Sequence, residues 1–317
     1  MAVNPIAPQS AAQPGSESTR VFDFLIIGAA RSGTTSLWRG LDSHPQIRVP
    51  SDKEREFFSS DERYARGIEQ YMKRTFAGAR EDQVLGTVTP QLMQPNTRAL
   101  ETIVSRIEDT CPEAKIIALL RDPVERTISQ FRRMKKIGQG REETFDAHVR
   151  RLVKKRGKLS KVPLIRASDY GRILSPYFEA FDRDQLEVFF TEELDADPAR
   201  LYRRLFEFLG VDPEHSPGTP RIHIGGTRQL VTAAALEELM QELDRVGAFS
   251  GVGEDARRGF IWWLRHLWNS DPDESGKEIS ERLRAILSRR YLADAEILLE
   301  LGIEPPWLDD LRAAAAA

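Results

Sequence analysis

The chain has 317 residues, of which 40% are hydrophobic and 30% charged, so it can bury a substantial core beneath soluble helical surfaces. Its 46 Lys and Arg against 49 Asp and Glu give a net charge of −3, which argues against a protein-wide field for nucleic acid. The single cysteine, Cys111, excludes an internal disulfide and a cysteine-based zinc site.

Residues 1–20 are rich in Ala, Pro, Gln and Ser, and this composition predicts a disordered lead-in. The segment lacks the basic start and long apolar run of a secretory signal. No stretch of the chain approaches the roughly 20 apolar residues that span a bilayer. We therefore expect no transmembrane segment and a cytoplasmic location.

From residue 21 onward, strand-like and helix-like segments alternate, which predicts a parallel sheet with helices on its faces. Strands are predicted at Val21–Ile27, Ile47–Val49, Val84–Thr87, Lys115–Leu120 and Leu186–Phe190. Helices are predicted at Thr34–Ser43, Asp61–Phe76, Asn96–Thr110, Pro123–Ile137, Thr144–Arg156, Asp169–Phe181 and Pro198–Leu209. After a loop at Gly210–Thr227, three more are predicted at Thr232–Val246, Val252–Leu267 and Lys277–Leu301.

This order of elements predicts an α/β, P-loop-like three-layer fold with a central parallel sheet flanked by helices and a helical C-terminal part. We expect a single domain over residues 21–312. Within it, residues 212–312 are expected to be mostly helical and to form an acceptor or lid region.

The segment FLIIGAARSGTTSL, Phe24 to Leu37, predicts a buried strand, a glycine-bounded turn and the start of a helix. Such a turn brings backbone N–H groups and the positive end of a helix dipole close to an anion. The kinase form of the loop, GxxxxGK[ST], has a Lys that reaches the outer phosphates. Thr34 stands in that place, and Arg31 is the only cation of the loop. The loop therefore favours an anion other than the outer phosphates of ATP.

A second motif, IIALLRDPVERTISQF, follows the predicted strand Lys115–Leu120. Arg121 then lies at the carboxyl end of a strand, where open α/β sheets bind ligands, and Ser129 follows two turns into the next helix. Asp122 has two interpretations. It is either the acid that holds Mg²⁺ in an NTPase, or a helix cap or ion-pair partner of Arg126; the Pro that follows favours the second.

A third motif, PSDKEREFF, sets Lys53, Glu54 and Glu56 before an aromatic pair that we expect to be buried. A carboxylate beside a buried Phe pair is a general-base candidate, because partial burial raises its pKa. Taken alone, the run is more simply a solvated group of charges.

These three motifs, in this order, resemble the PAPS-dependent sulfotransferases, especially the bacterial and heparan-type carbohydrate branches; PAPS is 3′-phosphoadenosine 5′-phosphosulfate. GTVTPQ, YGRILSPYFEAFDRDQLEVFFTEEL and RLFEFLGV extend the resemblance over roughly Phe22–Val211. It implies that the first loop cradles the 5′-phosphosulfate and that the second motif binds the 3′-phosphate. The donor-binding residues implied are Arg31, Ser32, Gly33, Thr34, Thr35, Ser36, Arg121 and Ser129, with Arg228 as a weaker match.

The resemblance implies in-line transfer of a sulfuryl group to a hydroxyl, or less readily an amine, with Glu54 as the base. Arg31 replaces a Lys that many relatives carry, so it would act by charge and not by proton transfer. Lys53 is grouped with Glu54 and Arg31 as catalytic. No metal is required, and the acceptor is a small molecule, secondary metabolite or carbohydrate, not nucleic acid. A P-loop small-molecule kinase and a non-catalytic nucleotide-binding module are the alternatives.

Three further features have a plainer interpretation. His44 is expected to end a helix, His148 to lie in an exposed basic helix, and His215 in a loop that can reach an acceptor. The basic run from Arg150 to Arg166 is expected to be a solvated face, with an acidic acceptor such as a glycan as the alternative. The segment FIWWLRHLW at 260–268 is expected to pack in the core, with a lid or dimer contact as the alternative.

Overall fold

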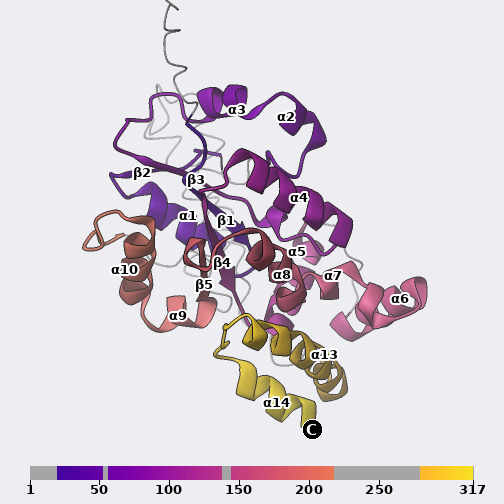
Figure 1. The fold of residues 1–317 in the computed structure, drawn as a ribbon. Helices are drawn as coiled ribbons and strands as arrows, with labels where there is room; N and C mark the ends of the chain where they lie inside the picture. Colours follow the sequence, from indigo (N-terminus) through magenta and orange to yellow (C-terminus); the bar gives the residue numbers. More distant parts are fainter. Residues whose placement is uncertain (1–19, 53–55, 138–143, 218–278, 317) are drawn as a thin grey trace, which may run out of the picture.

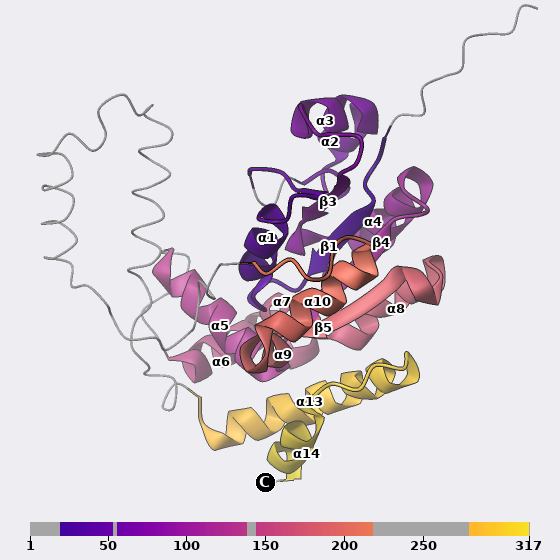
Figure 2. The same cartoon turned by 90° about the vertical axis from the view of Figure 1, so that its left-hand side faces the viewer.

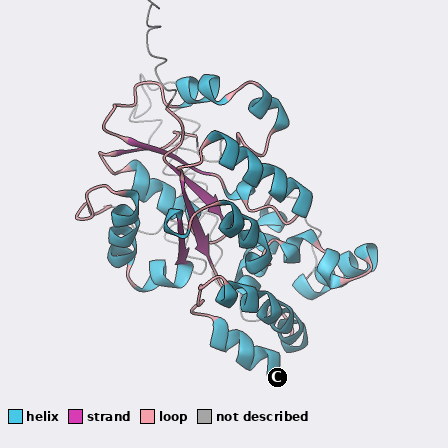
Figure 3. Ribbon diagram, in the orientation of Figure 1, coloured by secondary structure: helices cyan, strands magenta, loops and turns pink. Residues whose placement is uncertain are grey.

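The computed structural model describes residues 20–52, 56–137, 144–217 and 279–316. Its centre is a five-stranded parallel sheet of order β2-β3-β1-β4-β5 (Figure 1, Figure 3). The strands are β1 (Phe24–Gly28), β2 (Ile47–Arg48), β3 (Val84–Val88), β4 (Lys115–Leu120) and β5 (Leu186–Phe190). All five predicted strands are present, and β4 and β5 have the predicted bounds. The predicted α/β fold with a central parallel sheet is confirmed.

The helices before the C-terminal part follow the predicted order. They are α1 (Thr34–Asp42), α2 (Asp61–Ala65), α3 (Ile68–Thr75), α4 (Thr97–Thr110), α5 (Pro123–Lys136), α6 (Phe145–Arg156), α7 (Pro163–Arg166), α8 (Tyr170–Ala180), α9 (Thr191–Ala196) and α10 (Pro198–Leu209). Short 3₁₀ turns η1 (Pro90–Leu92), η2 (Leu159–Lys161) and η3 (Arg183–Gln185) connect some of them.

The single helix predicted over Asp61–Phe76 is wrong. The structure has two helices there, because Gly67 adopts a positive φ of 84°, which a right-handed helix cannot contain. Helices α7 and α9 were not predicted, and both are short. The two helices predicted within 232–267, and the segment FIWWLRHLW, lie outside the described residues.

Alternate residues of β1 face two separate hydrophobic clusters, which makes the fold three layers deep. Leu25 and Ile27 pack with side chains of α4, α5 and α8, whereas Phe24 and Ile26 pack with those of α1 and α10. In Figure 1, α1 and α10 accordingly lie on one side of the sheet, and α4 and α8 on the other. Side chains on both faces of β1 are fully buried, as expected for a central parallel strand.

The C-terminal part consists, where described, of α13 (Glu281–Glu300) and α14 (Leu308–Ala316). Helix α13 packs on α8 and α5, and α14 packs on α13 (Figure 1, Figure 2). The ring of Trp307 lies between those of Tyr170 and Phe190, at centroid distances of 6.3 and 6.5 Å. The helical C-terminal part that the sequence predicts is therefore confirmed, and it covers α8 beside the end of β5.

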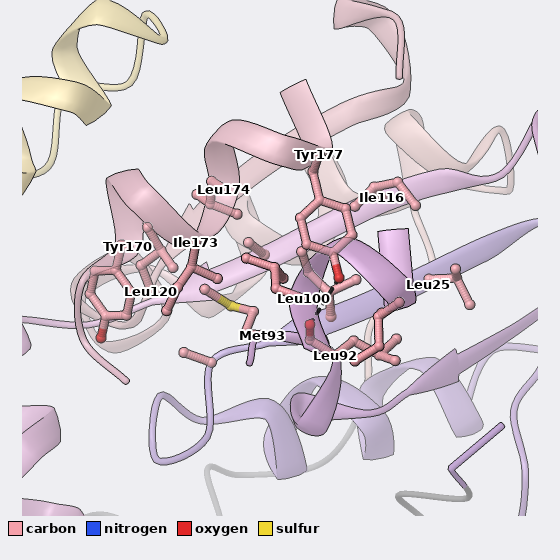
Figure 4. Close-up of a cluster of buried hydrophobic side chains, with 14 of the residues drawn as sticks. Leu25, Leu92, Met93, Leu100, Ile116, Leu120, Tyr170, Ile173, Leu174 and Tyr177 are labelled. Atoms are coloured by element: carbon pink, nitrogen blue, oxygen red, sulfur yellow. Dashed lines mark hydrogen bonds between the residues drawn. The ribbon is translucent and has the colours of Figure 1, made fainter. Parts of the chain in front are cut away.

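Helix α8 also makes a buried hydrogen bond inside the larger of the two clusters, the one that contains Leu25 and Ile27. The hydroxyl of Tyr177 donates to the carbonyl oxygen of Leu92 over 2.9 Å, and Figure 4 shows this bond among the packed side chains of the larger cluster. Cys111 is buried at the end of α4, and burial raises the pKa of its thiol to about 11. The thiol therefore stays protonated and packs as a small apolar side chain, as the sequence predicts. None of the described helices is long and apolar enough to cross a membrane.

Candidate functional site

The loop between β1 and α1 has the backbone of an anion-binding turn. Arg31 and Gly33 have φ values of 75° and 92°, and Gly33 is the cap of α1 without a capping side chain. The positive end of this helix therefore lacks the side-chain acceptor that most helices have, which is the arrangement that suits an oxyanion. At Gly28 a Cβ would lie 2.3 Å from Sδ of Met93, so a larger residue there would have to displace the Met93 side chain.

The loop is held from beneath by a residue that sequence reasoning missed. Oγ1 of Thr191, the first residue of α9, lies 2.8 Å from the carbonyl oxygens of both Ser32 and Leu120, and donates its proton between them. This hydroxyl ties the loop to the ends of β4 and β5. Thr191 falls in the segment VFFTEEL, which the family resemblance covers, but nothing in that segment indicates a partner in the loop.

The predicted donor-binding residues of the first loop differ in how much of their surface solvent can reach. Arg31 is exposed, and Gly33 and Thr35 are half-buried, so they can face a ligand. Thr34 and Ser36 are buried, with exposed fractions of 4% and 8%. Ser32 has no exposed surface at all, so in this state it shapes the loop and offers no hydroxyl to solvent.

Behind Ser32 lies the fully buried phenol of Tyr170. Burial raises the pKa of Tyr170 above its usual range, and the nearby guanidinium of Arg126 opposes that shift. The hydroxyls of Ser32 and Tyr170 are close enough to interact, but neither makes a hydrogen bond of ordinary geometry with a described residue. The loop thus rests on a buried polar layer contributed by α5 and α8.

The first and second motifs meet in the folded chain. Nε of Arg31 donates to Oγ of Ser129 over 3.2 Å, across 98 residues of sequence. Arg121, at the carboxyl end of β4, is half-buried, and its guanidinium makes no hydrogen bond or ion pair with any described residue. The sheet therefore brings together three of the predicted residues at one edge, two of them cations.

Asp122 is a helix cap. Its Oδ1 accepts the backbone N–H of Glu125 over 2.8 Å at the start of α5. No ion pair with Arg126 forms among the described residues; Nη2 of Arg126 donates to the carbonyl of Leu164 instead. Burial raises the pKa of Asp122 to about 6, and repulsion from Glu125 and Glu192 adds to the shift. A carboxylate engaged in this way is a poor magnesium ligand, which agrees with the cap interpretation.

The third motif is only partly described. Lys53 and Glu54, with Arg55, lie outside the described residues, and so does Arg228. The flanks of the motif are well anchored: Nε1 of Trp38 on α1 donates to the carbonyl of Pro50 over 3.1 Å. Phe57 and Phe58 have exposed fractions of 2% and 1%, so the predicted burial of this aromatic pair is confirmed. The motif therefore begins beside α1, the helix that opens the anion-binding turn.

Of the described histidines, His44 and His215 lie apart from this site. His44 follows the end of α1, about 13 Å from the loop for a helix of 9 residues, and its ring meets that of His215 edge to face at a centroid distance of 4.6 Å. Nε2 of His44 donates to the carbonyl of Asp212, and Nδ1 accepts from Gln46, so its role is structural. The expectation that His148 is exposed is wrong: it is buried against Phe131, because α6 packs on α5 through that face.

Comparison with known proteins agrees with this geometry. Residues 22–224 match the family described as "Sulfotransferase domain". The membrane-associated sulfotransferase kil1 of Dictyostelium discoideum is 41% identical over 112 residues, which cover 34% of this chain and 22% of the relative. Heparan sulfate glucosamine 3-O-sulfotransferase 5 of Mus musculus is 24% identical over 194 residues, covering 61% of this chain and 54% of the relative. The chain thus spans about half, or less, of the length of these curated relatives.

Among solved structures, a sulfotransferase from Alicyclobacillus acidocaldarius has the same fold. It superposes with a TM-score of 0.53 at 24% identity, over 75% of this chain and 99% of the other. The family match covers more than half of the sequence, includes both motifs that meet at Arg31 and Ser129, and extends beyond β5 and α10. The chain belongs to the sulfotransferase family.

Proposed function

We propose that the chain transfers a sulfuryl group from PAPS to a hydroxyl of an acceptor, by in-line displacement and without a metal. The observation that carries the proposal is the hydrogen bond from Arg31 to Ser129, because it unites the two predicted anion-binding motifs in one site. PAPS would supply the sulfuryl group and depart as 3′,5′-adenosine bisphosphate. The uncapped start of α1 and the half-buried Arg121 fit a ligand with two separate anionic ends.

Each predicted donor-binding residue is assigned to one part of the donor according to its position in the fold. Gly33, Thr34, Thr35 and Ser36 offer the start of α1 to the 5′ end, with Ser32 shaping the turn beneath it. Arg121 and Ser129 hold the 3′-phosphate, which contributes orientation and not chemistry. Arg31 belongs to the first loop and bonds to Ser129 of the second motif, and we assign it to stabilise the charge that develops on the leaving phosphate. Arg228 stays a prediction for the nucleotide.

Glu54 is proposed as the base that takes the proton of the acceptor hydroxyl, with Lys53 beside it. The support is the sequence motif and the anchored flanks at Pro50 and Phe57. A carbohydrate, small-molecule or secondary-metabolite acceptor is proposed, and the similarity to heparan sulfate sulfotransferases favours carbohydrate. Hydroxyl transfer is preferred to amine transfer, and a cytoplasmic location stays a prediction.

Calorimetry tests the donor. We expect 3′,5′-adenosine bisphosphate to bind without a metal, and Arg121→Ala to weaken that binding by about tenfold or more, since a hydrogen-bonded charge is lost. Arg98→Ala, which removes an exposed arginine at the start of α4, is the matched control and should bind normally. Preference for ATP with Mg²⁺ would favour the small-molecule kinase and overturn the proposal.

Glu54→Gln tests catalysis separately from binding. We expect this variant to keep its affinity for the bisphosphate and to lose turnover of any acceptor, or the slow hydrolysis of PAPS, by at least about a hundredfold. Retained turnover would remove Glu54 from the mechanism. A wild-type chain that binds the bisphosphate but turns over no PAPS would favour the non-catalytic nucleotide-binding module.

A further inference from the structure

A second cation-rich cleft lies on another part of the molecule. It has a volume of about 450 Å³, and its lining residues come from η2 and α7 on one side, and from α8 and α13 on the other. Five cationic side chains line it: Lys158, Lys161, Arg166, Arg172 and Arg290. The first three belong to the basic run that the sequence presents as a solvated face. The fold adds the other two from α8 and α13, so the cluster is a product of the tertiary structure.

The two carboxylates of the cleft are already engaged within the protein. Oδ2 of Asp169 accepts from Arg172 over 3.3 Å and forms a close ion pair with Arg290. The two oxygens of Asp294 accept the backbone N–H groups of Gly171 and Arg172 over 2.8 and 3.1 Å, at the start of α8. Five cations against two carboxylates leave a surplus of three positive charges.

That surplus has no partner within the described chain. The side chains of Lys158, Lys161 and Arg166 make no hydrogen bond or ion pair with a described residue, and Nη1 of Arg172 is buried without an acceptor. Burial, together with repulsion from Arg172 and Arg290, lowers the pKa of Arg166, while Asp169 opposes the shift. The fold therefore holds like charges together, and a bound anion would relieve their repulsion.

The cleft is distinct from the proposed donor site. Asp169 forms its inner wall, whereas the next residue, Tyr170, directs its phenol to the other side, behind Ser32 of the first loop. The three cations without an ion-pair partner, Lys158, Lys161 and Arg166, come from η2, the residue before it and α7, whereas Arg172 and Arg290 are paired with Asp169. Three cations around one cleft can engage more than one oxyanion of the same ligand. The lining includes no aromatic side chain on which a base could stack, which disfavours nucleic acid.

We propose that this cleft binds a ligand that carries at least two sulfate or phosphate ester groups, at a site separate from the donor. The cleft volume is within the range of small-molecule sites. Such a ligand could be a sulfated sugar or a polyphosphate, which present the same tetrahedral oxyanions. The inference holds whether or not the chain transfers sulfate, because it rests on the cleft alone.

The test is calorimetry on the full chain with saturating 3′,5′-adenosine bisphosphate. The probes are sucrose octasulfate, tripolyphosphate and, as the uncharged match, sucrose. We expect one equivalent of at least one anion to bind, more weakly at higher salt, and sucrose not to bind. Binding of the octasulfate alone identifies a sulfated sugar as the ligand class, and binding of tripolyphosphate alone identifies a polyphosphate.

Variants of the lining residues test whether the anions bind in this cleft. Lys158→Ala/Lys161→Ala should weaken binding by about tenfold, the loss of about 1.4 kcal/mol, and Arg166→Gln should do the same. Lys154→Ala/Lys155→Ala removes two exposed lysines of the same basic run outside the cleft, and should bind within about twofold of wild type. Arg121→Ala should also leave this binding unchanged, which separates the inference from the proposed donor site.

Three outcomes would overturn the inference. The first is that neither anion binds the wild-type chain. The second is that the Lys154→Ala/Lys155→Ala control loses as much affinity as the Lys158→Ala/Lys161→Ala variant. The third is that the anions bind only when the bisphosphate is absent, which would place them in the donor site. Because the substituted lysines are exposed and without partners among the described residues, these variants should fold, and an unchanged circular dichroism melt checks that they do.

Discussion

Arg31 and Ser129 are hydrogen-bonded at 3.2 Å, although 98 residues separate them. Arg31 is the only cation of the loop that precedes α1. Ser129 lies on α5, the helix that follows strand β4. Because β1 and β4 are neighbours in the sheet, their carboxyl ends carry the two side chains to the same place. The pairing turns two separate sequence motifs into one site.

Ser129→Ala should weaken binding of 3′,5′-adenosine bisphosphate by about tenfold. The hydroxyl is expected to contact the 3′-phosphate and it also orients Arg31, and a hydrogen bond to a charged group contributes about 1.5–3 kcal/mol. Calorimetry gives the dissociation constant. Thr102→Ala removes a hydroxyl that bonds only within α4 and should bind as wild type does. Equal affinity of the Ser129 variant would exclude it from the site.

Thr191→Val should destabilise the fold and loosen the first loop. The change keeps the side-chain shape but leaves the carbonyls of Ser32 and Leu120 without the proton they share, at a cost of about 1–3 kcal/mol. Urea denaturation measures the free energy of unfolding, and bisphosphate affinity should fall with it. Thr102→Val is the exposed control. A variant as stable as wild type would show that the hydroxyl does not hold the loop.

Gly171→Ala should separate α13 from α8. A Cβ at this position would lie 2.4 Å from the carbonyl oxygen of Asp294 and 2.7 Å from Cβ of Ile297, and backbone cannot move aside as a side chain can. We expect a loss of about 1–3 kcal/mol in unfolding free energy and faster hydrogen exchange in α13. Ser175→Ala, on the same helix, tests for a general effect on α8. Unchanged exchange in α13 would contradict the prediction.

Asp122 should make the fold less stable as pH rises from about 4 to about 6.5. Burial raises the pKa of the folded carboxyl to about 6, whereas an unfolded Asp titrates near 3.9. Between these values the unfolded chain has lost a proton that the folded chain keeps, so unfolding releases a proton and higher pH favours it. The contribution of this group is therefore greatest below pH 4.

Asp122→Asn checks the sign of this effect. The amide oxygen can still cap α5, so the variant should match wild type at pH 4 and exceed it above pH 6.5 by up to about 2–3 kcal/mol. Chemical denaturation at each pH measures the difference. Asp109→Asn, at an exposed position of α4, should show no such pH-dependent gain. A variant that is less stable than wild type at pH 7 would mean that the ionised cap stabilises the fold.

The sequence by itself determined the parallel sheet, most of its helices and the identity of the site motifs. Strands β4 and β5 have their predicted bounds, and Asp122 caps α5 as its position before a proline indicates. These features depend on apolar periodicity and on short-range steric preferences, which are written in neighbouring residues. The break at Gly67 also depends on a local preference, that of glycine for positive φ, although one continuous helix is predicted there from the sequence.

Only the tertiary structure decided which distant groups meet. The bond between Arg31 and Ser129, the support of the first loop by Thr191, and the joining of Arg290 to the basic run each unite segments far apart in the chain. The same applies to His148, which local sequence places on a basic surface and the packing of α6 on Phe131 buries. Such contacts depend on strand order and helix packing, because those set the distance between side chains that no local pattern connects.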